Sequence, residues 1–176
     1  MARNGAGEGP TVVIAYDGSP AARQAVVDAA KILGSCRVVV ATVWEEGLAY
    51  AVASSRIAGT SMPRRVDHEV ALAVDRGLHE HAERVSQEGA ALASSLGLDA
   101  RPLASLKAEG NIARTILRLA YEHQAAAIVV GSRGLSGIRA RLEGSTSKAL
   151  LKHASCPVIV VHAVDESHDE GKGNDA

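Results

Sequence analysis

The chain contains no phenylalanine, and aromatic residues make up only 2% of its 176 residues. Its core must therefore be built from Ala, Val, Leu and Ile, the main members of an apolar set that makes up 47% of the sequence. That apolar share is normal for a globular protein and excludes a generally disordered chain. The length is that of one domain with a substantial core.

Cysteine and long apolar runs are also scarce. Cys36 and Cys156 are too few for a disulfide framework, and because both stand beside apolar runs we expect buried thiols. No run approaches the ~18 apolar residues of a membrane span. The N-terminus lacks the apolar segment of a signal peptide. We therefore expect a cytoplasmic protein that has no membrane partner.

The net charge is only −1, so no overall basic field attracts nucleic acid, and we expect no nucleic-acid partner. The charge is uneven, because residues 164–176 hold five acidic residues and one lysine. That segment carries −4, which leaves +3 for the rest. We expect a flexible, glycine-rich lead-in over 1–10, a domain over 11–163 and an acidic disordered tail over 164–176.

Four short runs rich in Val and Ile predict buried strands, a weaker run that contains Pro102 predicts a fifth strand, and the segments between them carry apolar residues at helical spacing. This alternation requires crossover connections. It predicts a single α/β domain, an open parallel five-stranded sheet with helices on both faces. The expected strands are 11–16, 37–43, 100–106, 126–130 and 157–161, and the expected helices follow Pro20, run from about 66 to 96, follow Asn111 and span 145–153.

Several local expectations accompany these elements. Ser19 is expected to cap the first helix. Pro102 lacks a backbone donor, so the third strand is placed at a sheet edge. His153 lies on an apolar helix face and is expected to pack in the core. The stripe expected to face the core along the long helix consists of Val70, Val74, Leu78, His81, Val85 and Leu92.

The segment from Val130 to Thr146 carries the clearest chemistry. It runs from the end of a buried strand to the start of a helix, with the skeleton Gly-x2-Gly-x9-Gly-Ser-Thr. Glycines there let backbone amides approach an anion, and the helix start adds unpaired amides and a favourable dipole. The segment predicts a phosphate site. The P-loop pattern is absent and no Gly-x-Gly-x-x-Gly follows the first strand, which argues against a P-loop NTPase and a dinucleotide dehydrogenase.

This skeleton resembles the nucleotide-binding signature of the universal stress protein family. Residues 12–19 resemble the family's first strand and acidic turn, and residues 154–161 resemble its closing strand. The resemblance covers about residues 10–162. It implies an adenine nucleotide alpha hydrolase-like fold with strand order 3-2-1-4-5, in which Asp17 and Gly131 lie on either side of the switch point.

The resemblance also implies a ligand, because members that keep this glycine pattern typically bind ATP, which Mg²⁺ could accompany. Arg133, with Arg139 and Arg141, lies inside the loop and either pairs with phosphates or is simply solvated. The matching positions are Gly131, Gly134, Gly144, Ser145 and Thr146 for phosphates and ribose, Asp17 for adenosine, the backbone of Val43 for adenine, and Ala15 and Val130 for the pocket lining.

The fifth strand is apolar throughout, and an exposed apolar edge is an aggregation hazard unless it is paired. Pairing with a twofold mate would remove that hazard, so we expect a homodimer through the strand at Pro157–Val161. The resemblance implies the same interface, since family members often dimerise through this strand.

The expected function is a nucleotide-dependent regulator in stress response whose protein partners are unidentified. No general base or arginine finger is evident, which favours binding with negligible turnover. A slow Mg²⁺-dependent ATPase or phosphotransferase, a cyclic AMP-binding module and a scaffold without ligand are the alternatives. The seven histidines show no metal-ligand spacing, and no Gly-x-Ser-x-Gly elbow occurs.

Overall fold

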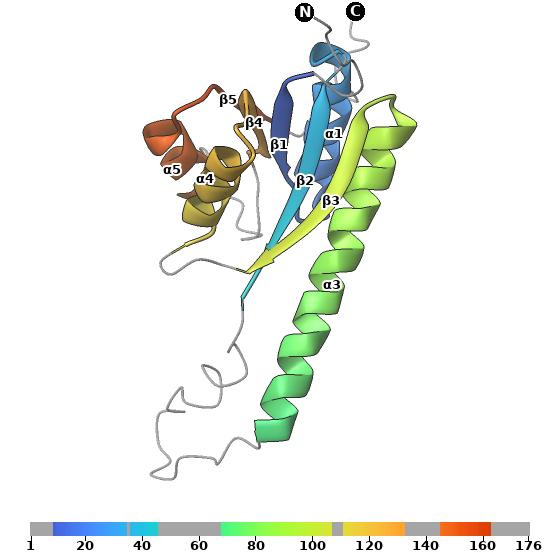
Figure 1. The fold of residues 1–176 in the computed structure, drawn as a ribbon, viewed down its shortest axis with the longest axis vertical. Coiled ribbons are helices and arrows are strands. Elements are labelled where there is room, and N and C mark those ends of the chain that lie inside the picture. Colours follow the sequence, from blue (N-terminus) through green and yellow to red (C-terminus); the bar gives the residue numbers. More distant parts are fainter. Residues whose placement is uncertain (1–8, 35, 46–67, 107–110, 133–144, 163–176) are drawn as a thin grey trace, which may run out of the picture.

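The computed structural model describes residues 9–34, 36–45, 68–106, 111–132 and 145–162. These residues form one sheet in which every neighbouring pair of strands is parallel, in the order β3-β2-β1-β4-β5 (Figure 1). The expected fold and strand order are therefore confirmed. The elements are β1 (Thr11–Ala15), α1 (Pro20–Ile32), β2 (Arg37–Trp44), α3 (His68–Ser95), β3 (Asp99–Leu106), α4 (Ile112–Glu122), β4 (Ala127–Gly131), α5 (Ser145–His153) and β5 (Val158–Val161).

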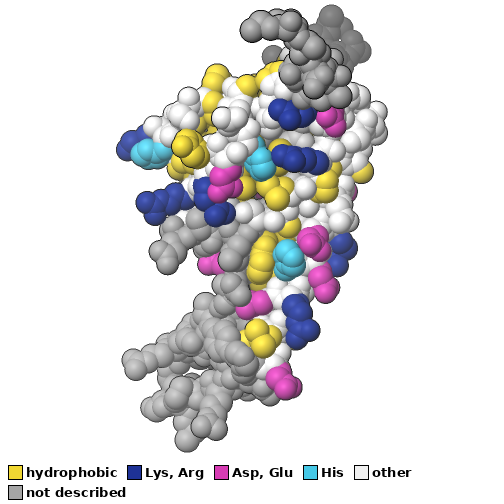
Figure 2. All heavy atoms as spheres, in the orientation of Figure 1, with side chains coloured by type: hydrophobic (Ala, Val, Ile, Leu, Met, Phe, Trp, Pro, Cys, Tyr) yellow, Lys and Arg dark blue, Asp and Glu magenta, His cyan; other side chains and the backbone are white. Residues whose placement is uncertain are grey.

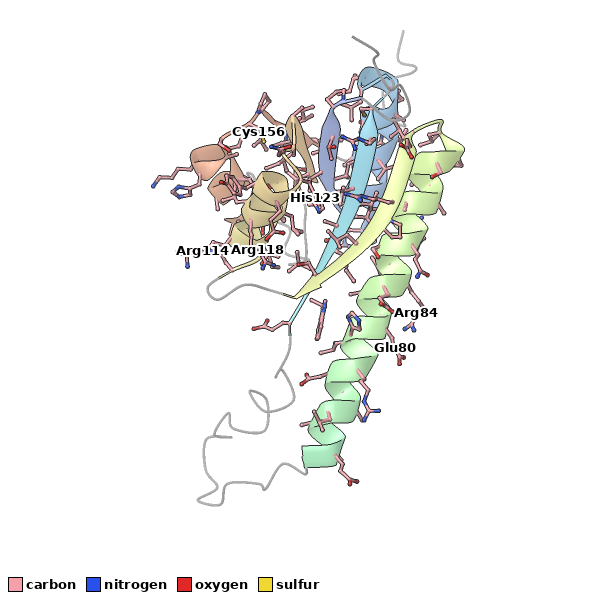
Figure 3. All side chains as sticks on the ribbon, viewed as in Figure 1. Glu80, Arg84, Arg114, Arg118, His123 and Cys156 are labelled. Atoms are coloured by element: carbon pink, nitrogen blue, oxygen red, sulfur yellow. The ribbon has the colours of Figure 1, made fainter. Side chains whose placement is uncertain are left out.

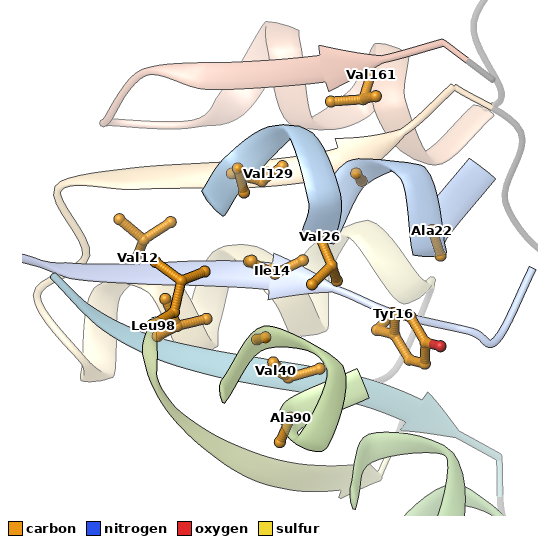
Figure 4. Packing of buried hydrophobic residues seen from close by; sticks show 14 of the residues in the cluster. Val12, Ile14, Tyr16, Ala22, Val26, Val40, Ala90, Leu98, Val129 and Val161 are labelled. Atoms are coloured by element: carbon orange, nitrogen blue, oxygen red, sulfur yellow. The ribbon is translucent and has the colours of Figure 1, made fainter. Parts of the chain in front are cut away.

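Helices cover both faces of the sheet. α1 and α3 pack on one face, and α4 and α5 pack on the other. Alternate residues of β1 divide between the faces, since Val12 and Ile14 join the α1 and α3 side whereas Val13 joins the α4 and α5 side. Figure 4 shows the first of these clusters, in which aliphatic side chains fill the space between strands and helices. Because helices cover both faces, β1 and β4 are nearly continuous apolar runs, whereas the edge strand β3 contains Arg101 and Ser105.

Side chains cap the helices that begin at the carboxyl end of the sheet. The Ser19 hydroxyl accepts a hydrogen bond from the Ala22 amide at 3.1 Å, with Pro20 in the first turn, as expected. Asn111 caps α4 in the same way, its Oδ1 accepting from the Arg114 amide at 2.9 Å. These bonds satisfy amides that have no partner within the helix.

The stripe expected along α3 is wrong at its N-terminal end. Val70 and Val74 are 57% and 40% exposed. α3 has 28 residues and is about 42 Å long, whereas the eight-residue β3 beside it spans about 26 Å. Its first turns therefore extend past the sheet (Figure 1). His81 of the expected stripe is exposed as well. The buried positions of α3 are mainly small residues, and the full set among its described side chains is Ala71, Asp75, Ala82, Val85, Ser86, Gly89, Ala90 and Ala93.

Two further expectations need correction. His153 is exposed. The residues of α5 that are buried are Ser147 and Leu150, and Ala154, just after the helix, packs against the same core cluster. Cys36 is buried as expected, but Cys156 is only half-buried. Burial raises the pKa of both thiols above the usual cysteine value.

The edge position that Pro102 predicted for β3 is confirmed. The lead-in and the acidic tail lie outside the described residues, except for residues 9 and 10. Within the described segments, none of the helices combines the length and the apolarity that a bilayer crossing requires.

Gly89 is where α3 approaches the sheet most closely. A Cβ built there would lie 2.7 Å from Cδ1 of Tyr16 and 2.8 Å from Cγ1 of Val40, and both residues belong to the core. We expect Gly89→Ala to lower the free energy of unfolding by about 1–3 kcal/mol through overpacking. This loss outweighs the ~1 kcal/mol that alanine gains over glycine within a helix.

Gly77→Ala is the matched control on the same helix, because a Cβ at Gly77 meets nothing within 4 Å. It should raise the free energy of unfolding by about 0.5–1 kcal/mol. Urea titration followed by far-ultraviolet circular dichroism measures both variants. Stabilisation of similar size at both glycines would contradict the close approach of α3 to Tyr16.

Candidate functional site

A pocket of about 470 Å³ opens at the carboxyl ends of β1, β2 and β4. The start of α5, the middle of α3 and residues of α4 complete its walls. The chain leaves β1 toward β2 on one side, while β4 lies on the other, so the pocket occupies the topological switch point. Open parallel sheets bind ligands at that point, and the volume lies within the range of small-molecule sites.

The structure brings seven of the ten predicted site residues together around this pocket. Register explains part of the convergence, because Ala15 at the end of β1 lies opposite Val130 at the end of β4. Arg133, Gly134 and Gly144 lie outside the described residues. The seven residues that line the pocket are Ala15, Asp17, Val43, Val130, Gly131, Ser145 and Thr146.

The turn after β1 is tied to the neighbouring strand, and this fixes the position of Asp17. The Tyr16 amide donates to the Ala41 carbonyl at 2.9 Å, and the buried Thr42 hydroxyl donates to the Tyr16 carbonyl at 2.9 Å. Oδ1 of Asp17 accepts from the Ser19 amide, also at 2.9 Å. The carboxylate thereby closes its own turn at the mouth of the pocket.

Gly131 allows the first turn of α1 to pack on the end of β4. A Cβ at Gly131 would lie 2.8 Å from the carbonyl carbon and 2.9 Å from the carbonyl oxygen of Ala21. A backbone contact of this kind cannot yield, so only glycine fits. Beyond it, the Ser132 amide donates to the Val161 carbonyl at 2.7 Å and keeps β4 and β5 together at this end.

The N-terminus of α5 supplies donors. Ser145, Thr146 and Ser147 form the start of this helix and line the pocket, and the first turn contains no acidic residue. The first amides of a helix lack intrahelical acceptors, and the helix dipole favours an anion beside them. The serine and threonine hydroxyl groups at these positions add further donors. This end of the pocket suits a phosphate group.

Charge around the pocket is distributed unevenly. Among the described lining residues, Asp17 and Glu45 hold the acidic side chains. Figure 2 shows Lys and Arg side chains gathered over α4 and α5; the exposed basic residues of these helices include Arg118 and Lys148. A positive surface beside the N-terminus of α5 raises the local concentration of anionic ligands.

Tyr16 forms a wall between the pocket and the core. Its hydroxyl donates to Oε1 of Glu88 at 3.4 Å, and Arg23 pairs with the same carboxylate oxygen. Burial raises the pKa of the Tyr16 hydroxyl above its usual value, although the Arg23 guanidinium opposes this effect. The phenol therefore stays neutral, and it links α3 to α1 beneath the pocket.

Sequence reasoning missed the wall made by α3, and at the end of β2 it included Val43 but missed Trp44. It assigned Leu78, His81 and Val85 to a stripe facing the core, and periodicity alone cannot separate a core face from a pocket face. Trp44, which also lines the pocket, gave no signal, since one aromatic at a strand end is uninformative. In the described part of the chain, no three His, Cys, Asp or Glu residues cluster closely enough to hold a metal ion.

Comparison of the sequence with known proteins gives a family match and several relatives. The universal stress protein family matches residues 10–162. A universal stress protein of Thermus aquaticus is 30% identical over 153 residues, which cover 86% of this chain and 97% of that protein. Two of the matches are partial. The chain spans only 12% of the Na(+)/H(+) antiporter NhaS5 of Synechocystis sp., 35% identical over 85 residues, and 20% of a universal stress protein of Mycolicibacterium smegmatis, 43% identical over 60 residues.

Solved structures share the fold. Hypothetical protein MJ0577 has a TM-score of 0.68 at 18% identity and covers 89% of this chain and 98% of its own. A universal stress protein in complex with cAMP has a TM-score of 0.57 at 21% identity, covering 88% and 98%. One from Archaeoglobus fulgidus in complex with dAMP has a TM-score of 0.50 at 19% identity, covering 87% and 97%. At these identities the likeness concerns the fold alone.

Proposed function

We propose that this chain, which belongs to the universal stress protein family, is a cytoplasmic ATP-binding regulator of the stress response. Nucleotide occupancy would change its contacts with other proteins. One observation carries the proposal: a single pocket holds a turn-fixed carboxylate, apolar strand ends and the N-terminus of a helix. The cAMP and dAMP complexes of similarly folded proteins support an adenine nucleotide as the ligand class.

Each part of such a ligand has a matching wall. The end of β2, where Val43 and Trp44 both line the pocket, suits an adenine ring. Asp17 is an acceptor suited to ribose hydroxyls, whereas it would repel phosphates. The N-terminus of α5 and the glycine segment that precedes it suit the phosphates. Mg²⁺, if bound, would be held chiefly by the phosphates and water, since the described residues offer no metal cluster.

Binding without turnover is favoured over a slow ATPase. Hydrolysis requires a base close to the attacking water. The described residues at the start of α5 are Ser145, Thr146 and Ser147, none of which is a general base on its own. An ATPase remains the alternative that a phosphate-release assay tests, and the cAMP complex of a similar fold makes a cyclic AMP module the other alternative.

The proposal is tested by identifying the nucleotide. The purified chain is denatured, any released nucleotide is identified by mass spectrometry, and ATP, ADP and cyclic AMP are then titrated with and without Mg²⁺. Retained ATP, or an affinity for ATP above the others, supports the regulator. Preference for cyclic AMP supports the second alternative, steady phosphate release supports the ATPase, and no binding overturns the whole assignment.

Substitutions at Asp17 test nucleotide recognition separately from folding. We expect Asp17→Ala to lower ATP affinity about 10- to 100-fold, because a hydrogen bond to a charged group contributes about 1.5–3 kcal/mol. Asp17→Asn keeps an acceptor for the Ser19 amide and should leave the melting temperature unchanged while still weakening ATP. Isothermal calorimetry and thermal melting measure the two effects. Full ATP affinity in a folded Asp17→Ala variant would remove Asp17 from the site.

A homodimer through β5 is part of the same proposal. β5 is the edge strand beside β4, and Val158, Ile159 and Val160 are only half-buried. Ile159→Asp should give monomers, because a charge at a strand-pairing edge opposes association. Light scattering measures the mass, with Leu151→Asp on the exposed face of α5 as the control. A folded Ile159→Asp variant with an unchanged dimeric mass would disprove this interface.

A further inference from the structure

Trp44 is the chain's one tryptophan, and it stands at the end of β2 on the wall of the pocket. Side chains alternate along a strand, so Val43 points to the α4 side while Trp44 points to the α3 side. Trp44 is half-buried. Leu78 and the small Ala82, both from α3, line the pocket with it. A flat aromatic surface therefore faces the space beside the strand end.

The indole is held from α3. The ring centroids of Trp44 and His79 are 5.0 Å apart with the planes tilted by 46°, a favourable aromatic arrangement. Nε2 of His79 lies 3.3 Å from Oε1 of Glu83, one turn further along α3, while Nδ1 is buried without a hydrogen-bond partner among the described residues. Nε2 is thus the nitrogen that donates to the carboxylate.

This arrangement differs from the rest of the α3 surface. Figure 3 shows Glu80 and Arg84 pointing away from the sheet. His79 instead lies against Trp44, so the Glu83–His79 pair orients a ring that contacts the pocket wall. Solvent exposure alone therefore does not account for a histidine at position 79, whereas the contact with Trp44 does.

We propose that Trp44 is a specificity-determining residue that stacks on the base of the bound nucleotide and selects purines, and that His79 is its positioning residue. The inference rests on the proposed function and adds the basis of base selection. A purine offers a larger π-surface to the indole than a pyrimidine does, whereas ribose and triphosphate are common to both nucleotides. Stacking on Trp44 therefore contributes to the preference between bases and not to phosphate binding.

The test compares ATP with CTP by calorimetry on the full chain. The unaltered protein should bind ATP about two- to tenfold more tightly than CTP, because cytosine also stacks and the larger purine adds only part of the about 1–3 kcal/mol that stacking contributes per base. Trp44→Ala should bring the ratio close to one, and Trp44→Phe should keep most of it. Since the chain has one tryptophan, ATP should also quench its fluorescence directly.

His79 is tested by rescue. His79→Ala should lower the ATP-to-CTP ratio, and His79→Phe should restore it, because phenylalanine keeps the ring contact but not the pairing with Glu83. Leu72→Ala, an exposed residue of the same helix, is the control and should leave the ratio unchanged. Thermal melting establishes that each variant is folded.

The outcomes are distinct. A wild-type ratio that persists in folded Trp44→Ala, or equal binding of ATP and CTP by the unaltered chain, overturns the role of Trp44 and leaves the proposed function standing. A ratio that falls equally in the Leu72→Ala control also overturns it. If the unaltered chain binds no nucleotide at all, the proposed function and this inference fail together.

Discussion

Close packing of helices on the sheet through small residues is the constraint on which the rest of the structure depends. Tyr16 supplies the one aromatic ring among the described buried core residues, and alanine and glycine stand at many of the contacts between helices and sheet. α3 lies against Tyr16 and Val40 at Gly89, and α1 lies against the end of β4 at Gly131. A close-packed interior has little room to adjust at such contacts, so both glycines determine how closely the helices approach the strands.

The site follows from that packing. Because α1 starts directly on the end of β4, the turn after β1 and the glycine end of β4 lie side by side. α5 begins near the same edge, and its first three residues line the pocket. Most of the anion-binding chemistry therefore comes from backbone and hydroxyl groups placed by topology. The charged side chain Asp17 is restricted by its own turn, which suits recognition of a neutral hydroxyl group.

The sequence was sufficient where local chemistry decides the structure. Val-rich runs, the Ser19 cap and the edge position of Pro102 predicted elements that the structure contains, while the strand order came from a family resemblance. It was insufficient where the outcome depends on how far one element extends past another. Val70 and Val74 have perfect helical spacing yet stand beyond the sheet, and His153 follows an apolar stripe that ends before it. Trp44 gained its place in the pocket only from the arrangement of β2 against α3.

The walls of the pocket differ in what they offer a ligand. Ser145, Thr146 and Ser147 line the α5 end, and Trp44 lines the β2 and α3 end. Asp17 stands between β1 and α1, where its Oδ1 accepts a hydrogen bond from the Ser19 amide. That bond holds the carboxylate at the mouth of the pocket before any ligand arrives. An acceptor fixed in this way loses little conformational entropy when a ligand binds, so the turn after β1 is suited to recognition.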